Sequence, residues 1–179
     1  MNRLQFLTTL LAAAKAGTPQ STVPQPATRP RAQRRQTEYT GRIAARPEAV
    51  FPLLCPVREY EWLDGWQCRM IYSDSGVAED NCLFETNFHG QKMIWTVARY
   101  APPRRIEFTV LAPDDLAVRL QIELKAHGSS TRIQWRRAFT GLSERGNLQI
   151  HEWRTERDAE LTAGIEHFLK TGTMRKPEA

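Results

Sequence analysis

The sequence contains few cysteines, and their spacing argues against folds held together by disulfides or by zinc. There are only three, Cys55, Cys68 and Cys82. An odd number without closely spaced pairs supports neither a disulfide framework nor a zinc site. We therefore interpret the three cysteines as small buried hydrophobic residues, with a reactive thiol as the alternative.

Several motifs of catalysis and cofactor binding are also missing. The chain has no glycine-rich phosphate loop and no nucleophile-elbow motif. Its four histidines, His89, His127, His151 and His167, lack the close spacing of metal ligands. We expect neither a metal nor a cofactor.

Positive charge is present but unevenly distributed. The net charge is +5, yet six of the 25 basic residues precede Glu38 and no acidic residue does. The remaining chain is close to neutral, with 19 basic against 20 acidic residues. Proteins that follow a nucleic-acid backbone need clustered cations on one face. We therefore expect the folded part not to bind nucleic acid.

Residues 1–36 are expected to form an N-terminal tail. The apolar stretch from Phe6 to Ala14 is too short to cross a bilayer, so we expect no stable membrane insertion. Ala14-Lys15-Ala16 has the form of a signal-peptidase site. Residues 17–36 are rich in Pro, Thr, Gln and Arg, a composition typical of linkers. We expect a cytoplasmic protein, with export or organellar targeting through residues 1–16 as the alternative.

Residues 37–173 are expected to form one domain, followed by a short tail at 174–179. Its clearest pattern is the alternation of apolar and polar residues over 116–125, which predicts a strand with one dry and one wet face. Turn-forming sequences of hairpin length separate similar runs and predict an antiparallel meander. The expected strands are 38–45, 66–73, 81–88, 91–100, 104–112, 116–126 and 130–140.

Three helices are expected to accompany these strands. Pro47 and Glu48 are suited to the first turn of a short helix, and a second short helix is expected to end at Gly65. The long helix is expected to begin at Thr155, with Asp158 as its capping partner, and to stop at Gly172. Since the dry face of the sheet requires a cover, we expect this helix to lie across it.

Several segments resemble the helix-grip fold of the START-related SRPBCC superfamily. They are GRIAARPEAVFPLL, EWLDGW, SGVAEDNCLFET, RIQWRRAFTGL and HFLKTG, and the likeness covers residues 38–173. The superfamily includes polyketide cyclase/dehydrase-like, lipid-transfer and pollen-allergen-like proteins. The resemblance implies an α+β fold with a curved seven-stranded antiparallel sheet around a long C-terminal helix. It also implies a cavity for hydrophobic small molecules, but no universal catalytic residue.

Aromatic and polar residues expected to point inward are the candidate ligand contacts. They are Trp62, Trp66, Tyr72, Phe84, Trp95, Tyr100, Phe108, Trp135, Arg137, Trp153 and Arg157. Ordinary core packing is the alternative role for each aromatic residue. Trp62 and Trp66 are expected either to border the ligand cavity or to anchor the short helices.

Arg137 is the most informative of these residues. If Ile133, Trp135 and Phe139 face the helix, strand alternation places Arg137 on the same apolar face. A buried guanidinium needs a partner. That partner is a ligand oxyanion, an internal acid such as Glu85, or solvent reached through a bulge. Arg157 poses a similar choice between a second ligand contact and a side chain that reaches to water.

We expect a carrier or sensor that binds a hydrophobic or aromatic small molecule. One alternative is a cyclase- or dehydratase-like enzyme in which Arg137 steadies an enolate and His151 or Glu85 moves protons. A protein-interaction module of the co-chaperone kind is a further alternative, which a completely filled core would favour. The sequence leaves the oligomeric state open.

Overall fold

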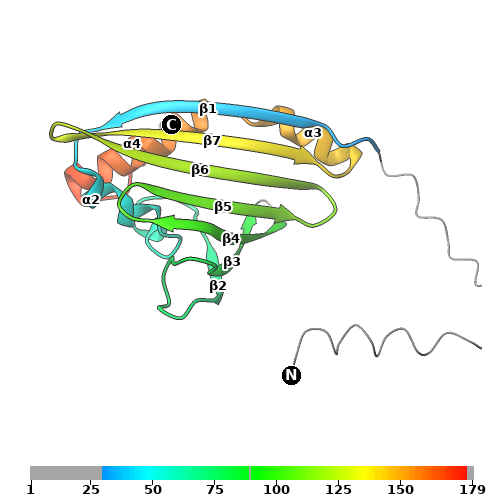
Figure 1. Cartoon of the computed structure of the whole chain (residues 1–179), viewed down its shortest axis with the longest axis horizontal. Coiled ribbons are helices and arrows are strands. Elements are labelled where there is room, and N and C mark those ends of the chain that lie inside the picture. Colours follow the sequence, from blue (N-terminus) through cyan, green and yellow to red (C-terminus); the bar gives the residue numbers. More distant parts are fainter. Residues whose placement is uncertain (1–29, 89, 177–179) are drawn as a thin grey trace, which may run out of the picture.

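A single curved sheet forms the body of the protein. The computed structural model describes residues 30–88 and 90–176, and in this part seven strands pair in the antiparallel order β1-β7-β6-β5-β4-β3-β2 (Figure 1). This confirms the expected helix-grip architecture. The residues before 30, including Ala14-Lys15-Ala16, and His89 lie outside the described residues. The strands are β1 Arg34–Ile43, β2 Cys68–Tyr72, β3 Leu83–Phe88, β4 Gln91–Ala101, β5 Arg105–Ala112, β6 Leu116–His127 and β7 Ser130–Gly141.

The strand bounds agree with the expected ones to within two residues, except at the start of β1. This strand begins at Arg34, before the domain boundary expected at residue 37. The additional residues continue the pairing with β7, where Arg34 lies opposite Thr140 and Arg35 opposite Phe139. Arg35 also donates hydrogen bonds to the backbone oxygens of Ile150 (2.7 Å) and Trp153 (2.8 Å). The end of the expected tail is therefore part of the sheet.

Short helices follow β1 and longer ones follow β7. Pro47 and Glu48 occupy the first turn of α2, as expected. Pro52, which has no backbone N–H, lies in the 3-10 helix η1 that continues α2. The helices are α2 Pro47–Val50, η1 Phe51–Leu54, η2 Glu59–Glu61, α3 Glu144–Glu152 and α4 Glu156–Thr171.

The C-terminal region differs from the expected single helix. The additional helix, α3, has only two large apolar residues, Leu148 and Ile150, and Ser143 caps it by accepting a hydrogen bond from the Gly146 N–H (3.0 Å). Thr155 is the N-cap residue of α4, as expected, but its side chain makes no capping hydrogen bond. Gly172, with φ +68°, ends α4 as predicted.

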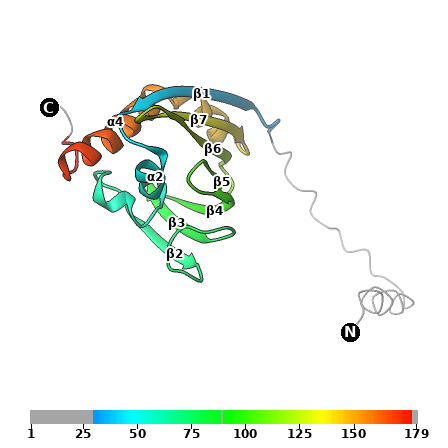
Figure 2. The ribbon, with the colours of Figure 1, turned by 60° about the vertical axis from the view of Figure 1, so that its left-hand side comes forward.

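The helices lie on the concave side of the sheet (Figure 2). Helix α3 packs against β7 and β1, α4 packs mainly against β1, and α2 contacts α4, β6 and β7. None of the described helices combines the length and apolar character that crossing a bilayer requires.

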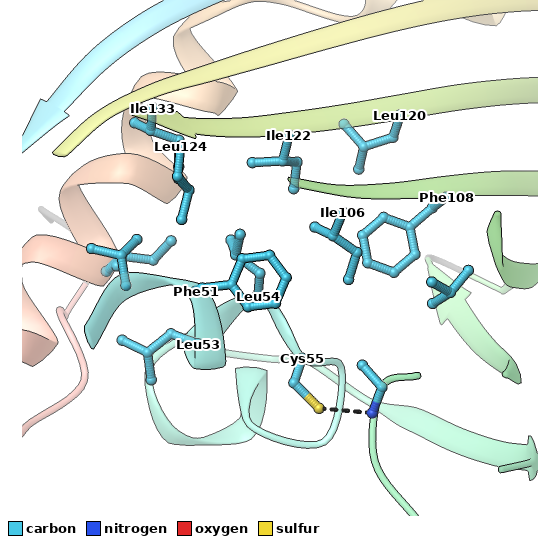
Figure 3. Packing of buried hydrophobic residues seen from close by; sticks show 14 of the residues in the cluster. Phe51, Leu53, Leu54, Cys55, Ile106, Phe108, Leu120, Ile122, Leu124 and Ile133 are labelled. Carbon is cyan, nitrogen blue, oxygen red and sulfur yellow. Dashed lines mark hydrogen bonds between the residues drawn. The ribbon is translucent and has the colours of Figure 1, made fainter. Parts of the chain in front are cut away.

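The α2–η1 segment fills one end of the concave face. Figure 3 shows Phe51 and Leu54 beneath Ile106 and Ile122, which come from β5 and β6. Cys55 follows this segment, and its Sγ accepts a hydrogen bond from the Ala78 N–H (3.2 Å). Cys55 and Cys82 are buried, as expected, and Cys68 is half-buried; none of the three forms a disulfide.

Gly146 allows α3 to cross the turn between β5 and β6. A Cβ atom on Gly146 would lie 1.7 Å from the backbone oxygen of Asp115, which accepts the Leu142 N–H (2.7 Å). We predict that Gly146→Ala lowers the free energy of unfolding by about 3 kcal/mol, because backbone atoms must move to admit the methyl group. Urea denaturation measures this loss.

Leu148→Ala is the control, because Leu148 lies in the same helix and is 70% exposed. It should change the free energy of unfolding by less than about 0.5 kcal/mol. Equal stability of the two variants would show that Gly146 of α3 does not pack closely against the backbone of Asp115.

Candidate functional site

A row of inward-facing side chains crosses the whole concave face. Residues directly opposite each other in antiparallel strands point to the same face. The strand register places one residue from each strand in this row. In order from β1 to β2, they are Arg35, Phe139, Val118, Val110, Trp95, Phe84 and Met70.

Part of this row is accessible. Phe139 and Val110 are buried, but Val118, Trp95 and Met70 keep part of their surface exposed. They lie beyond the end that α2 and η1 cover. The concave face therefore presents apolar surface that the described helices do not completely bury. We refer to Val118, Trp95, Met70 and the neighbouring half-buried Met93 as the open strip.

Four aromatic residues meet at the β3–β5 end of the open strip. Trp95 stacks on Phe84 with ring centroids 5.5 Å apart, and Phe108 lies edge-on to Trp95 at 5.8 Å. Trp66 makes an edge-to-face contact with Trp95 at 6.3 Å. The Trp95 indole N–H donates to the Thr86 Oγ1 (2.9 Å), which fixes the ring in its plane. The structure thus brings together four of the predicted contact residues.

The two tryptophans of EWLDGW have different environments. Trp62 is 3% exposed, donates to the Leu53 backbone oxygen (2.9 Å), and packs so close to Gly164 that a Cβ there would lie 3.3 Å from the ring. Trp66 is half-buried and donates to the Pro56 backbone oxygen (2.8 Å). Trp62 therefore anchors the short helices to α4, which is one of its two expected roles, and it does not border the open strip. Trp66 belongs to the aromatic group beside the open strip.

A buried ion pair joins β7 to α4. Arg137 is 7% exposed and contacts Asp158, which is 1% exposed, through its Nη1. Burial raises the pKa of the Asp158 carboxyl, and the positive charge of Arg137 opposes that rise. The predicted inward direction of Arg137 is correct. Its internal partner is Asp158, which the sequence pattern had suggested as a helix cap.

Aromatic rings surround this ion pair. The Arg137 guanidinium carbon lies 4.3 Å from the ring centroid of Trp153 and 5.4 Å from that of Trp135. The Trp135 N–H donates to the Thr162 Oγ1 (3.0 Å), which in turn donates to the Asp158 backbone oxygen (2.8 Å). Trp153 lies near the Asp158 carboxylate. Like Arg137, it opposes the rise of the Asp158 pKa, although no hydrogen bond of normal geometry joins the two side chains. The pair is thus held from several sides.

Glu59 is a second carboxyl group near Arg137 that sequence reasoning did not select. Its side chain keeps some exposed surface, yet burial raises its pKa to about 8, and the charge of Arg137 limits that rise. Among the described residues, no hydrogen-bond or ion-pair partner contacts its carboxyl. The adjacent Glu61 differs, because it pairs with Arg58 (2.8 Å). A carboxyl with a strongly shifted pKa near an interior charge is a candidate functional group.

Three further predicted contact residues also lie away from the open strip. Tyr72 is 58% exposed and donates to Asp74 (2.9 Å), so its expected inward position is wrong. Tyr100 packs edge-on against Phe51 (5.5 Å), at the end filled by η1. Arg157 is exposed on α4 and pairs with Glu160 (3.7 Å).

The two proton-transfer candidates also face elsewhere. Glu85 lies on the outer face of the sheet, where it pairs with Arg69 (2.8 Å) and Lys92 (2.5 Å). His151 is exposed, with its Nε2 3.3 Å from the Gln33 Oε1. Neither residue reaches the concave face, so the expected roles of Glu85 and His151 beside Arg137 are wrong.

The described residues form at least two depressions on the outer face. One of about 510 Å³ is lined mainly by polar and charged side chains, among them Asp80, Arg99, Glu107 and Arg119. The other, of about 160 Å³, is lined by Glu123, Lys125, Arg132, Gln134 and Arg136. Neither has the apolar lining that a hydrophobic molecule needs. The open strip on the concave face is therefore the stronger candidate site.

Comparison with protein families gives a match over most of the chain. Residues 34–169 match the model of a family described as polyketide cyclase / dehydrase and lipid transport. Among curated protein sequences, none matches the chain.

Solved structures with the same fold have little sequence identity to the chain. Norcoclaurine synthase from Thalictrum flavum, in complex with dopamine and hydroxybenzaldehyde, has a TM-score of 0.61 at 12% identity and covers 82% of this chain and 91% of its own. Ara h 8.0201 has a TM-score of 0.57 at 9% identity, with 78% and 99% covered. CalU16 from Micromonospora echinospora has a TM-score of 0.51 at 13% identity, with 78% and 86% covered. These similarities establish the fold.

The Arg137–Asp158 pair allows a direct stability test. Asp158→Leu leaves a buried guanidinium unpaired, so we predict that the free energy of unfolding falls by about 3–5 kcal/mol. Adding Arg137→Met should restore much of that loss, because the double variant buries no charge. Urea denaturation of the two single variants and the double variant measures the coupling. Additive losses would show that the two side chains do not depend on each other.

The raised pKa of Glu59 predicts a pH dependence of stability. Folding takes up a proton between the unfolded-state pKa, about 4.3, and the folded-state value of about 8. Glu59 therefore reduces stability as the pH rises through this window. Glu59→Gln should raise the free energy of unfolding at pH 9 by about 2 kcal/mol and change it far less at pH 5.

Glu61→Gln is the control for this comparison. Its pKa is lowered, first by the hydrogen bond from Arg58, so its replacement removes a favourable interaction and should not stabilise the protein at pH 9. Equal stabilities of the parent and Glu59→Gln at pH 9, measured by urea denaturation, would contradict the raised pKa.

Proposed function

Because the chain belongs to the polyketide cyclase/dehydrase and lipid transport family, we propose that it binds a hydrophobic or aromatic small molecule on its concave face. The observation that carries this proposal is the open strip. Val118 and Trp95 lie on either side of Val110, each directly opposite it in the strand register, and both keep exposed surface. A ligand that covered them would remove apolar area from water.

The chemistry of the surrounding residues supports an aromatic ligand. The Trp95, Phe84 and Phe108 rings are already oriented in stacked and edge-on contacts, so a further ring could add to the group in the same geometries. Norcoclaurine synthase, which shares the fold, binds dopamine and hydroxybenzaldehyde in one of its structures, and both are small aromatic molecules. Binding alone requires no reacting group, which suits a carrier or sensor.

A cyclase- or dehydratase-like enzyme is the second candidate, and Glu59 is the observation that favours it. General acid–base catalysis works best when the pKa of the catalytic group is near the working pH. Glu59, with a pKa of about 8 and Arg137 nearby, meets that condition. Under this alternative, Glu59 would exchange a proton with the ligand. Glu59→Gln would then abolish turnover while binding persists.

The binding proposal is tested with a neutral aromatic probe, 2-naphthol. We predict that Trp95→Ala weakens binding about tenfold or more, since aromatic stacking and area burial are both lost. Tyr72→Ala is the matched control, because Tyr72 is an exposed aromatic residue on β2. Calorimetric titration of folded samples measures the affinities.

If Trp95→Ala does not fold, a second variant that fills the open strip still tests the proposal. Val118→Trp adds bulk at the centre of the open strip and should also remove binding. If the parent binds no probe, or if Tyr72→Ala weakens binding as much as the two strip variants do, the concave face is not the binding site.

A further inference from the structure

The outer face of the sheet generally places acids between cations. Glu85 lies between Arg69 and Lys92 and contacts both. Glu107 likewise contacts both Arg105 and Arg119. Opposite charges on neighbouring strands attract, whereas like charges directly opposite each other destabilise a sheet. These arrangements are therefore explained by the stability of the sheet.

One place on this face breaks the pattern. Arg42 of β1 lies directly opposite Arg132 of β7, and Arg132 lies directly opposite Lys125 of β6. All three side chains are exposed, and none has an acidic partner among the described residues. We refer to Arg42, Arg132 and Lys125 as the cation row. It lies near the hairpin that connects β6 to β7 (Figure 1).

The nearest acids do not neutralise the cation row. Glu123 pairs with Arg105 (2.9 Å), and Glu38 pairs with Arg136 (3.1 Å) and accepts a hydrogen bond from Gln134 (2.6 Å). The Arg42 Nη2 instead lies 3.4 Å from the Nδ1 of His127. Repulsion within the row is thus uncompensated inside the described part of the protein.

Two residues of the cation row, Lys125 and Arg132, line a depression that suits a small anion, and the third, Arg42, lies directly opposite Arg132 on β1. The volume of the depression is about 160 Å³, and Lys125, Arg132 and Arg136 line it together with Gln134 and Glu123. Arginine forks and a lysine ammonium group are the donors that proteins use for phosphate oxygens, and the Gln134 amide adds a neutral donor. An anion in this place would turn the repulsion among the three cations into attraction toward a shared partner.

We propose that the cation row binds a phosphate group on the outer face of the sheet, separate from the concave-face ligand. The phosphate belongs either to a free phosphate ester or to the headgroup of an anionic lipid. Both sources present the same tetrahedral oxyanion to Lys125 and Arg132 in the depression, with Arg42 beside Arg132. The proposal rests on the strand register and the depression alone, so it stands whether or not the concave face binds an aromatic molecule.

Titration with inorganic phosphate at constant ionic strength, followed by amide NMR, tests the site. We expect saturable shifts centred on Arg42, Lys125 and Arg132. Arg132→Gln should weaken the phosphate affinity about tenfold, because one charge-assisted donor is lost. Arg99→Gln removes the same charge from another exposed place on the outer face and should leave the affinity unchanged. Absence of saturable shifts, or equal weakening by both variants, would overturn the proposal.

Thermal unfolding in low salt without phosphate separates a binding role from a structural one. Arg132→Gln should raise the melting temperature, because it removes two like-charge contacts. A lower melting temperature would mean that Arg132 stabilises the fold and would contradict the proposal.

Vesicle sedimentation distinguishes the two sources of phosphate. Arg132-dependent binding to vesicles of phosphatidic acid in phosphatidylcholine, with none to pure phosphatidylcholine, supports a lipid headgroup. Saturable binding of inorganic phosphate without vesicle binding supports a soluble phosphate ester. Binding to both vesicle types that does not depend on Arg132 would overturn the assignment to the cation row.

Discussion

Arg137 lies on the dry face of β7, and its burial depends on Asp158 of α4. A guanidinium in an apolar interior requires an opposite charge, so the start of α4 is held next to β7, the second strand from the β1 edge of the sheet. Thr162, one turn further along α4, fixes Trp135 in the same region. Arg35 supports the same arrangement from β1, because it holds the junction between α3 and α4 through two backbone oxygens. The ion pair therefore sets where the C-terminal helices lie, and with them which part of the concave face stays accessible.

This placement divides the concave face into two parts with different properties. At one end, Phe51 and Leu54 of η1 pack into the sheet and complete an ordinary core (Figure 3). At the other end, Val118, Trp95, Met93 and Met70 remain partly exposed beside ordered aromatic rings. Water in contact with this apolar surface is displaced favourably by an apolar ligand. The same helix placement that buries the ion pair thus leaves a surface suited to a hydrophobic molecule.

Local pattern was sufficient to predict most of the sheet, because alternation and hairpin turns are properties of neighbouring residues. It also placed Arg137 inward, since parity along β7 follows from Trp135 and Phe139. It could not identify Asp158 as the partner, because that pairing joins two elements that meet only in the folded chain. A usable signal was present: Asp158, Leu161 and Ile165 share one helical face, which puts an acid on an apolar stripe. Helix α3 was missed because Leu148 and Ile150 are too few to form such a stripe.

The tryptophans and acids of residues 59–66 also show that local pattern does not reveal contacts between distant elements. Trp62 and Trp66 are equivalent in pattern, yet one is anchored on Gly164 and the other contacts Trp95. Glu59 and Glu61 flank Tyr60, but only Glu61 finds an arginine beside it on the surface. Which of two similar side chains turns inward depends on the elements packed opposite, and no local rule gives that information.

The central claim is that a small molecule occupies the concave face beside Trp95. Methyl NMR of ¹³C-methyl-methionine protein with 2-naphthol tests it most directly, because Met70 and Met93 lie on that face and Met174 lies beyond the end of α4. The account predicts saturable ring-current shifts at Met70 and Met93 with Met174 unchanged. Unchanged Met70 and Met93 resonances at saturating probe, or shifts of the same size at Met174, would contradict it.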